Sequence, residues 1–220
     1  MQWKVCGLRT PENIGLVLAL RPDFVGFIFY EKSPRYVGEG FHLPPDLDWG
    51  PVRRVGVFVN HSVDFIFSQV NRYKLDGIQL HGDESPEFCA ALKSPILRGA
   101  RDIAPSVLTI KAFGLGPGFD FESLAPYLPE VDYFLFDTKS PEYGGTGQAF
   151  GWELLRDYPF AKPFFLSGGL GLENAGVLRQ FLDVHPDLPL AGLDLNSRFE
   201  HAPGHKDPAL LQEFKHYLGL

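Results

Sequence analysis

Two side chains able to transfer protons stand at the ends of short apolar runs in this 220-residue sequence. Cys6 follows one such run near the start, and its thiol becomes a base or nucleophile once it is ionised. Asp137 follows three apolar residues, where loss of solvent favours the protonated form and suits a general acid. Each also has a plainer interpretation, because cysteine is often buried and inert and aspartate often caps a loop. The position of each residue in the fold decides between the two interpretations.

His81 and Arg35 are further polar residues that follow apolar runs. His81 could act on a substrate, bind a metal or hydrogen-bond within the protein, and the sequence leaves these roles open. Arg35 offers a planar fork that fits a carboxylate or a phosphate. Taken alone, a solvated surface arginine is the simpler interpretation of this residue.

Glycine and small polar residues follow two of the later apolar runs. Gly168 and Gly169 come after one run, and Asn196 with Ser197 comes after the next. Backbone N–H groups in such turns can approach an anion closely, and the dipole of a following helix favours negative charge. Two turns of this kind indicate a phosphorylated small molecule as the substrate. A third glycine-rich loop, Tyr143–Gly147, is longer than a plain connection and also favours function.

The elements that must position these residues are eight short runs rich in β-branched and aromatic side chains. Most of the runs are continuously apolar, which is typical of parallel strands covered on both faces. The predicted strands are Trp3–Cys6, Phe24–Phe29, Arg54–Val59, Gly77–Leu80, Leu108–Phe113, Tyr133–Asp137, Phe164–Ser167 and Ala191–Leu195.

Segments with apolar residues three and four apart lie between these runs and predict helices. Three of them follow a residue that can cap a first turn, namely Thr10, Ser62 and Asp207. The predicted helices are Pro11–Leu20, Val63–Tyr73, Pro86–Leu92, Leu172–Leu182 and Pro208–Leu218.

Eight strands alternating with helices predict an α/β fold, either a closed barrel or an open doubly wound sheet. The first strand-to-helix turn, Cys6–Thr10, lacks the GxGxxG pattern of dinucleotide folds, so we expect a (β/α)8 TIM barrel as a single domain over residues 1–220. The second helix is expected to be degraded, because Glu31–Pro51 is rich in glycine and proline. For the fifth strand we prefer Leu108–Phe113 over Ile96-Leu97, since a helix-like segment, Asp120–Leu128, follows it.

Composition excludes several classes of function. The formal net charge of −7 argues against a general nucleic-acid binder. Cys6 and Cys89 form no CxxC pair, so a zinc or thioredoxin-like site lacks support. No signal-peptide pattern or 18-residue apolar stretch occurs, so we expect no membrane segment and a cytoplasmic location. His201 and His205 have helical metal-pair spacing, but Pro203 and Gly204 between them indicate a loop, and no metal site is predicted.

The ordered set of motifs resembles the phosphoribosylanthranilate isomerase family of tryptophan biosynthesis. The resemblance covers nearly the whole chain, and the joint order and spacing make it specific. The matching stretches are Lys4-Val5-Cys6-Gly7, Gly26–Tyr30, Ser33-Pro34-Arg35, Val55–Asn60, Gln79–Glu84, Phe136–Lys139, Tyr143–Gly147, Leu166–Leu170 and Gly192–Ser197.

The resemblance implies a (β/α)8 barrel that carries out an Amadori rearrangement without a metal or redox cofactor. It implies that Cys6 is the general base and Asp137 the general acid, which requires an ionised thiol beside a protonated carboxyl group, the reverse of their usual order. Further implied roles are anthranilate-carboxylate binding by Arg35, sugar-hydroxyl binding by Asp194, and phosphate binding by Gly145, Gly168, Gly169, Asn196 and Ser197. We also place His81 among the substrate-binding residues.

The sequence departs from the family pattern at Arg198, where glycine is common, so this arginine either adds a phosphate contact or points outward. Pro203–Asp207 keeps the family pattern and is interpreted as the cap of the last helix. Two other functions remain open: a related barrel isomerase of the histidine pathway, which uses two aspartates, and a barrel that binds phosphorylated ligands without turnover. Whether the protein is a monomer or a homodimer is also open.

Overall fold

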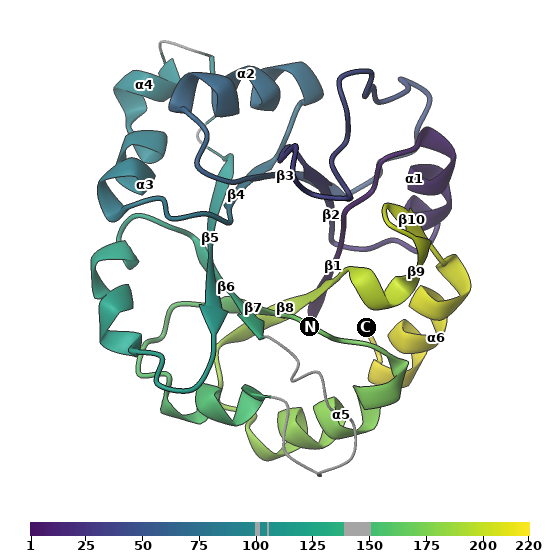
Figure 1. Cartoon of the computed structure of the whole chain (residues 1–220), viewed down its shortest axis with the longest axis vertical. Helices are drawn as coiled ribbons and strands as arrows, with labels where there is room; N and C mark the ends of the chain where they lie inside the picture. Colours follow the sequence, from purple (N-terminus) through teal and green to yellow (C-terminus); the bar gives the residue numbers. More distant parts are fainter. Residues whose placement is uncertain (100–101, 105, 139–150) are drawn as a thin grey trace.

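Eight parallel strands close into a barrel in the computed structural model, which describes residues 1–99, 102–104, 106–138 and 151–220 (Figure 1). Each strand pairs in parallel with the next, and β1 also pairs with β8, so the predicted barrel is confirmed. The strands are β1 (Gln2–Cys6), β2 (Phe24–Ile28), β3 (Arg53–Phe58), β4 (Gly77–Leu80), β5 (Leu108–Leu115), β6 (Tyr133–Thr138), β7 (Phe164–Ser167) and β8 (Leu190–Leu195).

Helices surround the barrel and cover the outer faces of the strands (Figure 1). Short 3₁₀ helices replace or extend them at η1 (Phe121–Tyr127), η2 (Gly151–Asp157), η3 (Leu172–Asn174) and η4 (Ser197–Phe199). None of the helices in the described part of the chain has the length and apolar character needed to span a membrane. The α-helices are α1 (Pro11–Leu18), α2 (Val63–Tyr73), α3 (Pro86–Lys93), α4 (Pro95–Gly99), α5 (Ala175–Val184) and α6 (Pro208–Leu218).

The connection between β2 and β3 contains no helix over residues 31–51, all of which the structure describes, so the predicted loss of the second helix is confirmed. Aromatic side chains of this connection cover β2 in place of a helix. Phe41 and Trp49 pack on Phe27 of β2, with ring centroids 5.2 and 6.4 Å away. Two large rings can therefore shield the strand face that a helix would otherwise cover.

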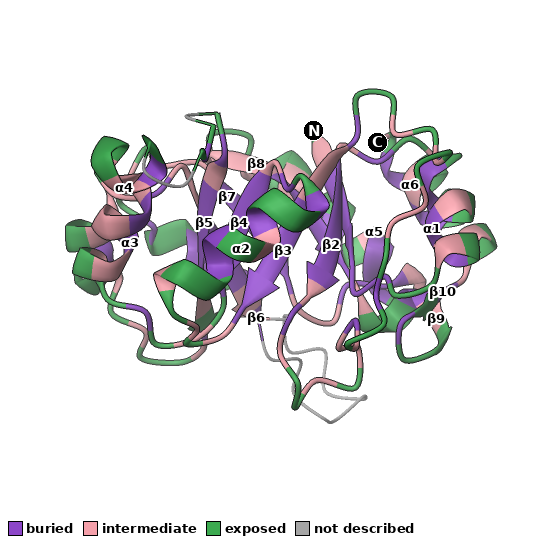
Figure 2. Cartoon of the chain, turned by 90° about the horizontal axis from the view of Figure 1, so that it is seen from above, coloured by how far each residue is buried: buried purple, intermediate pink, exposed green. Residues whose placement is uncertain are grey.

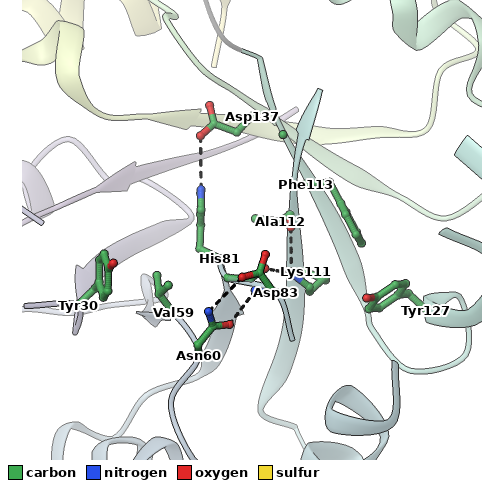
Figure 3. Close-up of a pocket in the computed structure, with 12 residues that line it drawn as sticks. Tyr30, Val59, Asn60, His81, Asp83, Lys111, Ala112, Phe113, Tyr127 and Asp137 are labelled. Carbon is green, nitrogen blue, oxygen red and sulfur yellow. Dashed lines mark hydrogen bonds and ion pairs between the residues drawn. The ribbon is translucent and has the colours of Figure 1, made fainter. Parts of the chain in front are cut away.

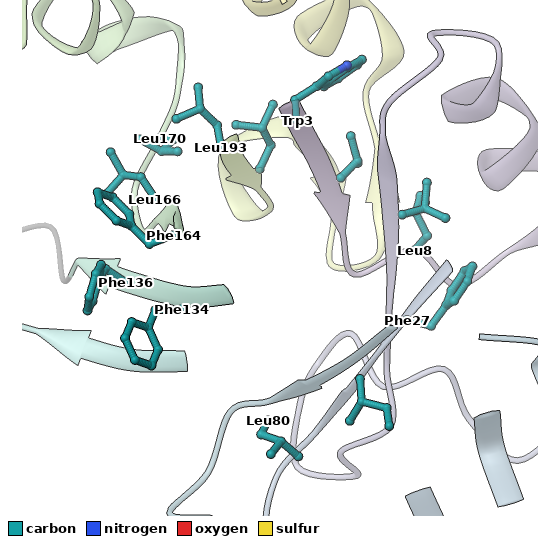
Figure 4. Packing of buried hydrophobic residues seen from close by; sticks show 14 of the residues in the cluster. Trp3, Leu8, Phe27, Leu80, Phe134, Phe136, Phe164, Leu166, Leu170 and Leu193 are labelled. Atoms are coloured by element: carbon teal, nitrogen blue, oxygen red, sulfur yellow. The ribbon is translucent and has the colours of Figure 1, made fainter. Parts of the chain in front are cut away.

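Alternation along the strands separates two hydrophobic cores. The inner one fills the barrel with Phe24, Val55, Ile110, Ala112, Leu135 and Phe165. The outer one lies between strands and helices and includes alternate residues such as Phe134, Phe136 and Leu166 (Figure 4). The strands are buried on both sides while the helices expose their outer faces (Figure 2). This burial explains the continuously apolar runs in the sequence.

Local predictions outside the strands have mixed outcomes. The helix-like segment Asp120–Leu128 contains the 3₁₀ helix η1 and its two capping residues, and Pro126 inside it has no backbone N–H donor. Thr10 precedes α1 but makes no capping hydrogen bond with its side chain, whereas Ser62 and Asp207 cap their helices as expected. The segment with His201 and His205 is a small hairpin of β9 (Glu200–Ala202) and β10 (His205–Lys206), consistent with the absence of a helix there.

Candidate active site

The carboxyl ends of the strands carry a polar layer above the inner core. Asp137 lies two residues after Leu135 on β6, and Ser167 lies two residues after Phe165 on β7, so each shares the inward face of its apolar neighbour. Cys6 on β1 occupies the same end of the barrel. The sequence pattern thus turns from apolar to polar at the level where barrel enzymes hold their substrates.

A cavity of about 200 Å³ brings together seven of the residues predicted for the site. It is formed where the loops after β7 and β8 meet the ends of β6 and β8 and the loop after β2. Gly145, which is also predicted to bind phosphate, lies outside the described residues. The predicted residues that line the cavity are Arg35, Asp137, Gly168, Gly169, Asp194, Asn196 and Ser197.

Glycine is required at position 168 because the loop after β7 passes very close to β6. Gly168 has a φ of +93°, and Gly169 follows with a φ of +62°. A Cβ atom on Gly168 would lie 2.0 Å from the carbonyl oxygen of Thr138 and 2.7 Å from Oδ1 of Asp137. Any side chain there would push the loop away from the carboxyl group. The glycine turn and Asp137 are therefore packed as one unit.

A second, wider cavity of about 720 Å³ lies over β3 to β6 and also includes Asp137 (Figure 3). His81 projects into it, and its Nε2 lies 3.4 Å from Oδ2 of Asp137. This distance is longer than a normal hydrogen bond, as is common for catalytic groups before substrate binds. Asp137 is 40 % exposed, so it is less desolvated than the apolar run before it suggests.

Cys6 ends β1 with its thiol buried, and it is absent from the described lining of both cavities. Gly26 on β2 makes room for it, since a Cβ there would lie 2.6 Å from Sγ of Cys6. Burial raises the pKa of the thiol above its ordinary value; Lys4 and Lys206 oppose this shift, while Asp194 adds to it. The expected ionised resting thiol is therefore not favoured by its surroundings.

Lys4 and Asp194 form a buried ion pair beside the thiol, with 2.8 Å between Nζ and Oδ1. They face each other across the β1–β8 pairing. Burial lowers the pKa of the Lys4 ammonium group, but Asp194 and Cys6 outweigh that effect and raise it. Lys4 therefore supplies a permanent positive charge next to Cys6.

Arg35 is held by a second carboxylate rather than left free for a ligand. Its guanidinium donates to both oxygens of Glu200, with Nε at 2.8 and 3.1 Å and a further short contact from Nη2. The same carboxylate accepts from Lys206 Nζ at 2.9 Å, and Lys206 also donates to Oδ1 of Asn196 at 2.7 Å. These contacts link the arginine to the turn after β8.

Four residues that the sequence reasoning left without a role take part in the site. Glu200 and Lys206 are far from Arg35 in the chain, so no local pattern links them. Lys4 could have been found, because it lies two residues before Cys6 on the same strand face. Gln79 could have been found in the same way, as a polar residue inside an apolar strand.

Arg198, the departure from the family pattern, points away from the cavity. Its Nε lies 3.4 Å from Oε1 of Glu173, and both side chains are about half exposed. Arg198 is absent from the lining of the cavity formed by the described residues. The structure therefore favours the outward-pointing alternative.

Comparisons with known proteins identify the family to which the chain belongs. A family model for N-(5'-phosphoribosyl)anthranilate (PRA) isomerase matches residues 3–216. The chain is 44% identical over 213 residues to N-(5'-phosphoribosyl)anthranilate isomerase of Parabacteroides distasonis, covering 96% of this chain and 90% of that protein. The chain belongs to the phosphoribosylanthranilate isomerase family. This membership favours a tryptophan-pathway isomerase over the histidine-pathway relative.

Solved structures of the phosphoribosylanthranilate isomerase family share the fold. One shows monomers generated from the dimeric enzyme of Thermotoga maritima, with a TM-score of 0.70, 28% identity and coverage of 100% of this chain and 98% of that chain. Another phosphoribosylanthranilate isomerase is in complex with reduced 1-(o-carboxyphenylamino)-1-deoxyribulose 5-phosphate. It has a TM-score of 0.73, 32% identity and full coverage of both chains.

Proposed function

We propose that the chain converts N-(5-phosphoribosyl)anthranilate into 1-(2-carboxyphenylamino)-1-deoxyribulose 5-phosphate, an isomerisation in tryptophan biosynthesis. The observation that carries the proposal is the shared position of Asp137. It lines both the cavity formed by the two anion-binding loops and the wider cavity beside His81. A phosphorylated sugar bound by those loops would present its reacting carbon atoms to this carboxyl group.

The smaller cavity is suited to the phosphate group. Gly168 and Gly169 supply a turn with positive φ angles, in which backbone N–H groups can approach an anion. Ser197 begins the short helix η4 after β8, and Asn196 precedes it. Loops after the seventh and eighth strands are the usual phosphate site of this fold. We assign Gly145 to the same role.

Asp137 is the proposed general acid of the first step. It gives its proton to the furanose ring oxygen as the C1–O bond breaks, which leaves a protonated Schiff base at C1 and a carboxylate on Asp137. Such a proton transfer by a positioned group is worth roughly 10²–10⁴ in rate. The neighbouring His81 lies on the side of Oδ2, opposite the glycine turn at Oδ1.

Cys6 is the proposed general base of the second step. Its thiolate removes the proton from C2, and the electron pair moves to the Schiff base to give an enolamine. The enolamine then loses its O2 proton and gains one at C1, which yields the ketone and restores both protein groups. Because burial raises the pKa of Cys6, the reaction draws on a thiolate that Lys4 and Lys206 help to stabilise.

Arg35 and Asp194 are the proposed substrate-orienting residues. Arg35 binds the anthranilate carboxylate, and the substrate must then share or replace Glu200 as its partner. Asp194 binds sugar hydroxyl groups while Lys4 holds its Oδ1 atom. His81 contacts the substrate from the wider cavity.

The proposal covers residues 1–220 as one catalytic unit acting in the cytoplasm on a phosphorylated small molecule. It involves neither nucleic acid nor membrane. Every step is a proton transfer, so the reaction needs no metal or redox cofactor. The protein acts as a monomer or a homodimer, and sedimentation of the purified chain distinguishes these states.

The test compares Cys6→Ala and Asp137→Asn with the unchanged protein in a turnover assay. We expect each substitution to lower kcat by roughly 10²–10⁴ with an unaltered circular dichroism spectrum. Cys89→Ala, at a buried thiol on α3 that is absent from the described lining of both cavities, is the matched control and should retain activity. Near-normal turnover in both site variants would refute the assigned roles, and tight product binding without turnover in the unchanged protein would indicate a binding protein.

A further inference from the structure

Gln79 occupies a position where a polar side chain is out of place. It lies on β4 with 1 % of its surface exposed, inside the described part of the barrel. Its partners in the neighbouring strands are Val57 on β3 and Ile110 on β5. Burying an amide among apolar side chains costs free energy unless its hydrogen bonds are replaced. A leucine would suit this position better if packing were the only requirement.

Among the described residues, the amide of Gln79 has one hydrogen bond to another side chain, and its partner is His81. Its Nε2 lies 3.1 Å from Nδ1 of the imidazole. Its Oε1 is buried and has no hydrogen-bond partner among the described residues. The amide oxygen of Gln79 is thus left unsatisfied while its nitrogen contacts one ring nitrogen of His81.

The backbone that carries His81 is fixed independently. Glu84 accepts hydrogen bonds from the backbone N–H groups of Gly82 and Asn60, at 3.0 and 2.8 Å. Lys111 donates to the carbonyl oxygen of Gly82 at 2.7 Å and pairs with Glu84 at 3.3 Å. With the loop held in place, the ring orientation and the tautomer are the remaining freedoms of His81.

From these contacts we propose that Gln79 is a positioning residue that holds neutral His81 in its Nε2–H tautomer and directs that N–H at the carboxyl group of Asp137. Nδ1 accepts from the Gln79 amide, so the single ring proton resides on Nε2. Nε2 faces Oδ2 of Asp137 at 3.4 Å (Figure 3). The inference rests on the proposed function, in which Asp137 is the general acid.

The chemical benefit comes after Asp137 has given its proton to the ring oxygen. The carboxylate that remains carries a new negative charge, and the Nε2–H of His81 is already aimed at it. A donor fixed in advance stabilises developing charge without reorganising during the reaction. His81 keeps its own proton throughout, so Gln79 affects the step without touching the substrate.

The opposite tautomer would work against this step. With the proton on Nδ1, the bare Nε2 would face Asp137 and accept the proton that the reaction must deliver to the sugar. The remaining ionisable groups around this cavity are Asp83, Lys111 and the phenols of Tyr30 and Tyr127. Lys111 is already engaged with Glu84 and Gly82, so it does not replace His81 at the carboxylate.

The first experiment measures the tautomer directly. Protein with ¹⁵N-labelled histidine is studied by NMR, in which protonated and bare ring nitrogens have well-separated shifts. His81→Gln identifies its signals among those of the seven histidines. We expect a protonated Nε2 and a bare Nδ1 in the unchanged protein, and a mixture of tautomers in Gln79→Leu. A protonated Nδ1 in the unchanged protein, or an unaltered spectrum in Gln79→Leu, would overturn the proposal.

The second experiment separates positioning from stability. Gln79→Leu should lower kcat by roughly 10- to 100-fold with KM within about twofold, since the effect concerns proton transfer rather than binding. Its melting temperature should not fall, because an unpartnered buried oxygen is removed. Gln212→Leu on the exposed face of α6 is the matched control. Unchanged kcat in Gln79→Leu, or a loss of activity that only follows unfolding, would contradict the role.

The turnover of Asp137→Asn, compared with that of Gln79→Leu, also separates this inference from the proposed function. If Asp137→Asn retained full turnover, the acid assignment would fail and Gln79 would have no catalytic step to serve. If Asp137→Asn were inactive but Gln79→Leu fully active, the proposed function would stand and the positioning role would be wrong. Low activity in both, with the expected tautomer change, supports both.

Discussion

The buried thiol of Cys6 illustrates how one residue is set by its neighbours. Burial raises its pKa, while the ammonium groups of Lys4 and Lys206 lower it and Asp194 raises it further. Because the net shift is upward, the thiolate fraction increases with pH through values above the ordinary range of a thiol, near 8.5. The base that the mechanism requires is therefore scarce at neutral pH.

This shift predicts the alkaline behaviour of the enzyme. We expect kcat/KM to rise with pH beyond the value at which an ordinary thiol would have fully ionised. The rate of alkylation of Cys6 by iodoacetamide should rise over the same interval. The measurement is best made in Cys89→Ala, because Cys89 is also buried and has a pKa raised to about 11. Rapid alkylation at neutral pH would show that Cys6 is already ionised.

The pKa of Glu200 is shifted downward, opposite to that of Cys6, and this shift leads to a prediction about stability at low pH. Burial alone would raise its pKa, but hydrogen bonds from Arg35 and Lys206 outweigh that effect and hold it below the ordinary value of 4.5. A carboxyl group with a lowered pKa stabilises the fold above its unfolded pKa. That contribution is lost as the pH falls through the lower, folded value.

Glu200→Gln should therefore destabilise the protein at neutral pH by about 3 kcal/mol, because it leaves Arg35 and Lys206 without their carboxylate. Urea unfolding at pH 7 and at about pH 3 provides the measurement. The difference in stability between the two proteins should shrink at the acidic pH, because the carboxyl group of Glu200 becomes protonated as the pH falls. An equal difference at both values would contradict the charge-based explanation.

Helix starts show how the same type of sequence signal can have different structural outcomes. Ser62 accepts a hydrogen bond from the backbone N–H of Phe65 at 3.2 Å, whereas the side chain of Thr10 makes no such bond. Ser62→Ala should cost about 1 kcal/mol of unfolding free energy, and Thr10→Ala only a few tenths. Urea denaturation of both variants tests this, and equal losses would show that the capping bond is not the cause.

Much of the fold at this scale could be predicted from the sequence. The continuous apolar runs located all eight strands to within two residues at either end, because burial on both faces leaves a strong local signal. The helical pattern of Asp120–Leu128 did not show that η1 is a 3₁₀ helix rather than an α-helix, although Pro126 lies inside it. The covering of β2 by Phe41 and Trp49 depends on tertiary packing, which no periodicity records.

Some residues of the site could be predicted from the sequence and others could not, because only some of them have a local sequence signal. Seven residues at strand ends converge on one cavity, because parallel strands in a barrel bring their carboxyl ends together. Arg35 and Glu200 are paired across 165 positions of the chain, and neither has a local motif that indicates the other. The surroundings of Cys6 were also misjudged, since the net effect of burial and three charged side chains requires the coordinates.

Two hydrophobic cores stabilise the whole molecule, one inside the barrel and one between the strands and the helices. The inner core fills the barrel beneath the active site, and Phe165 packs there on Phe24 with ring centroids 5.5 Å apart. Phe165→Ala should lower the free energy of unfolding by about 3–5 kcal/mol. Ile96→Ala, at a side chain that is 82 % exposed, should change it by less than about 0.5 kcal/mol. Thermal unfolding compares the two, and a small effect of Phe165→Ala would contradict the packing described.

Gly168, in the proposed phosphate turn, lies very close to Asp137, the proposed acid. The turn that we propose as the phosphate site is packed directly against Oδ1 of Asp137, so a phosphate bound there would also hold the proposed acid in position. A sugar lacking its phosphate would then be deficient in turnover as well as in affinity, because its remote group no longer aligns the reacting one. We therefore expect turnover to depend on the distance between the phosphate group and C1 of the sugar.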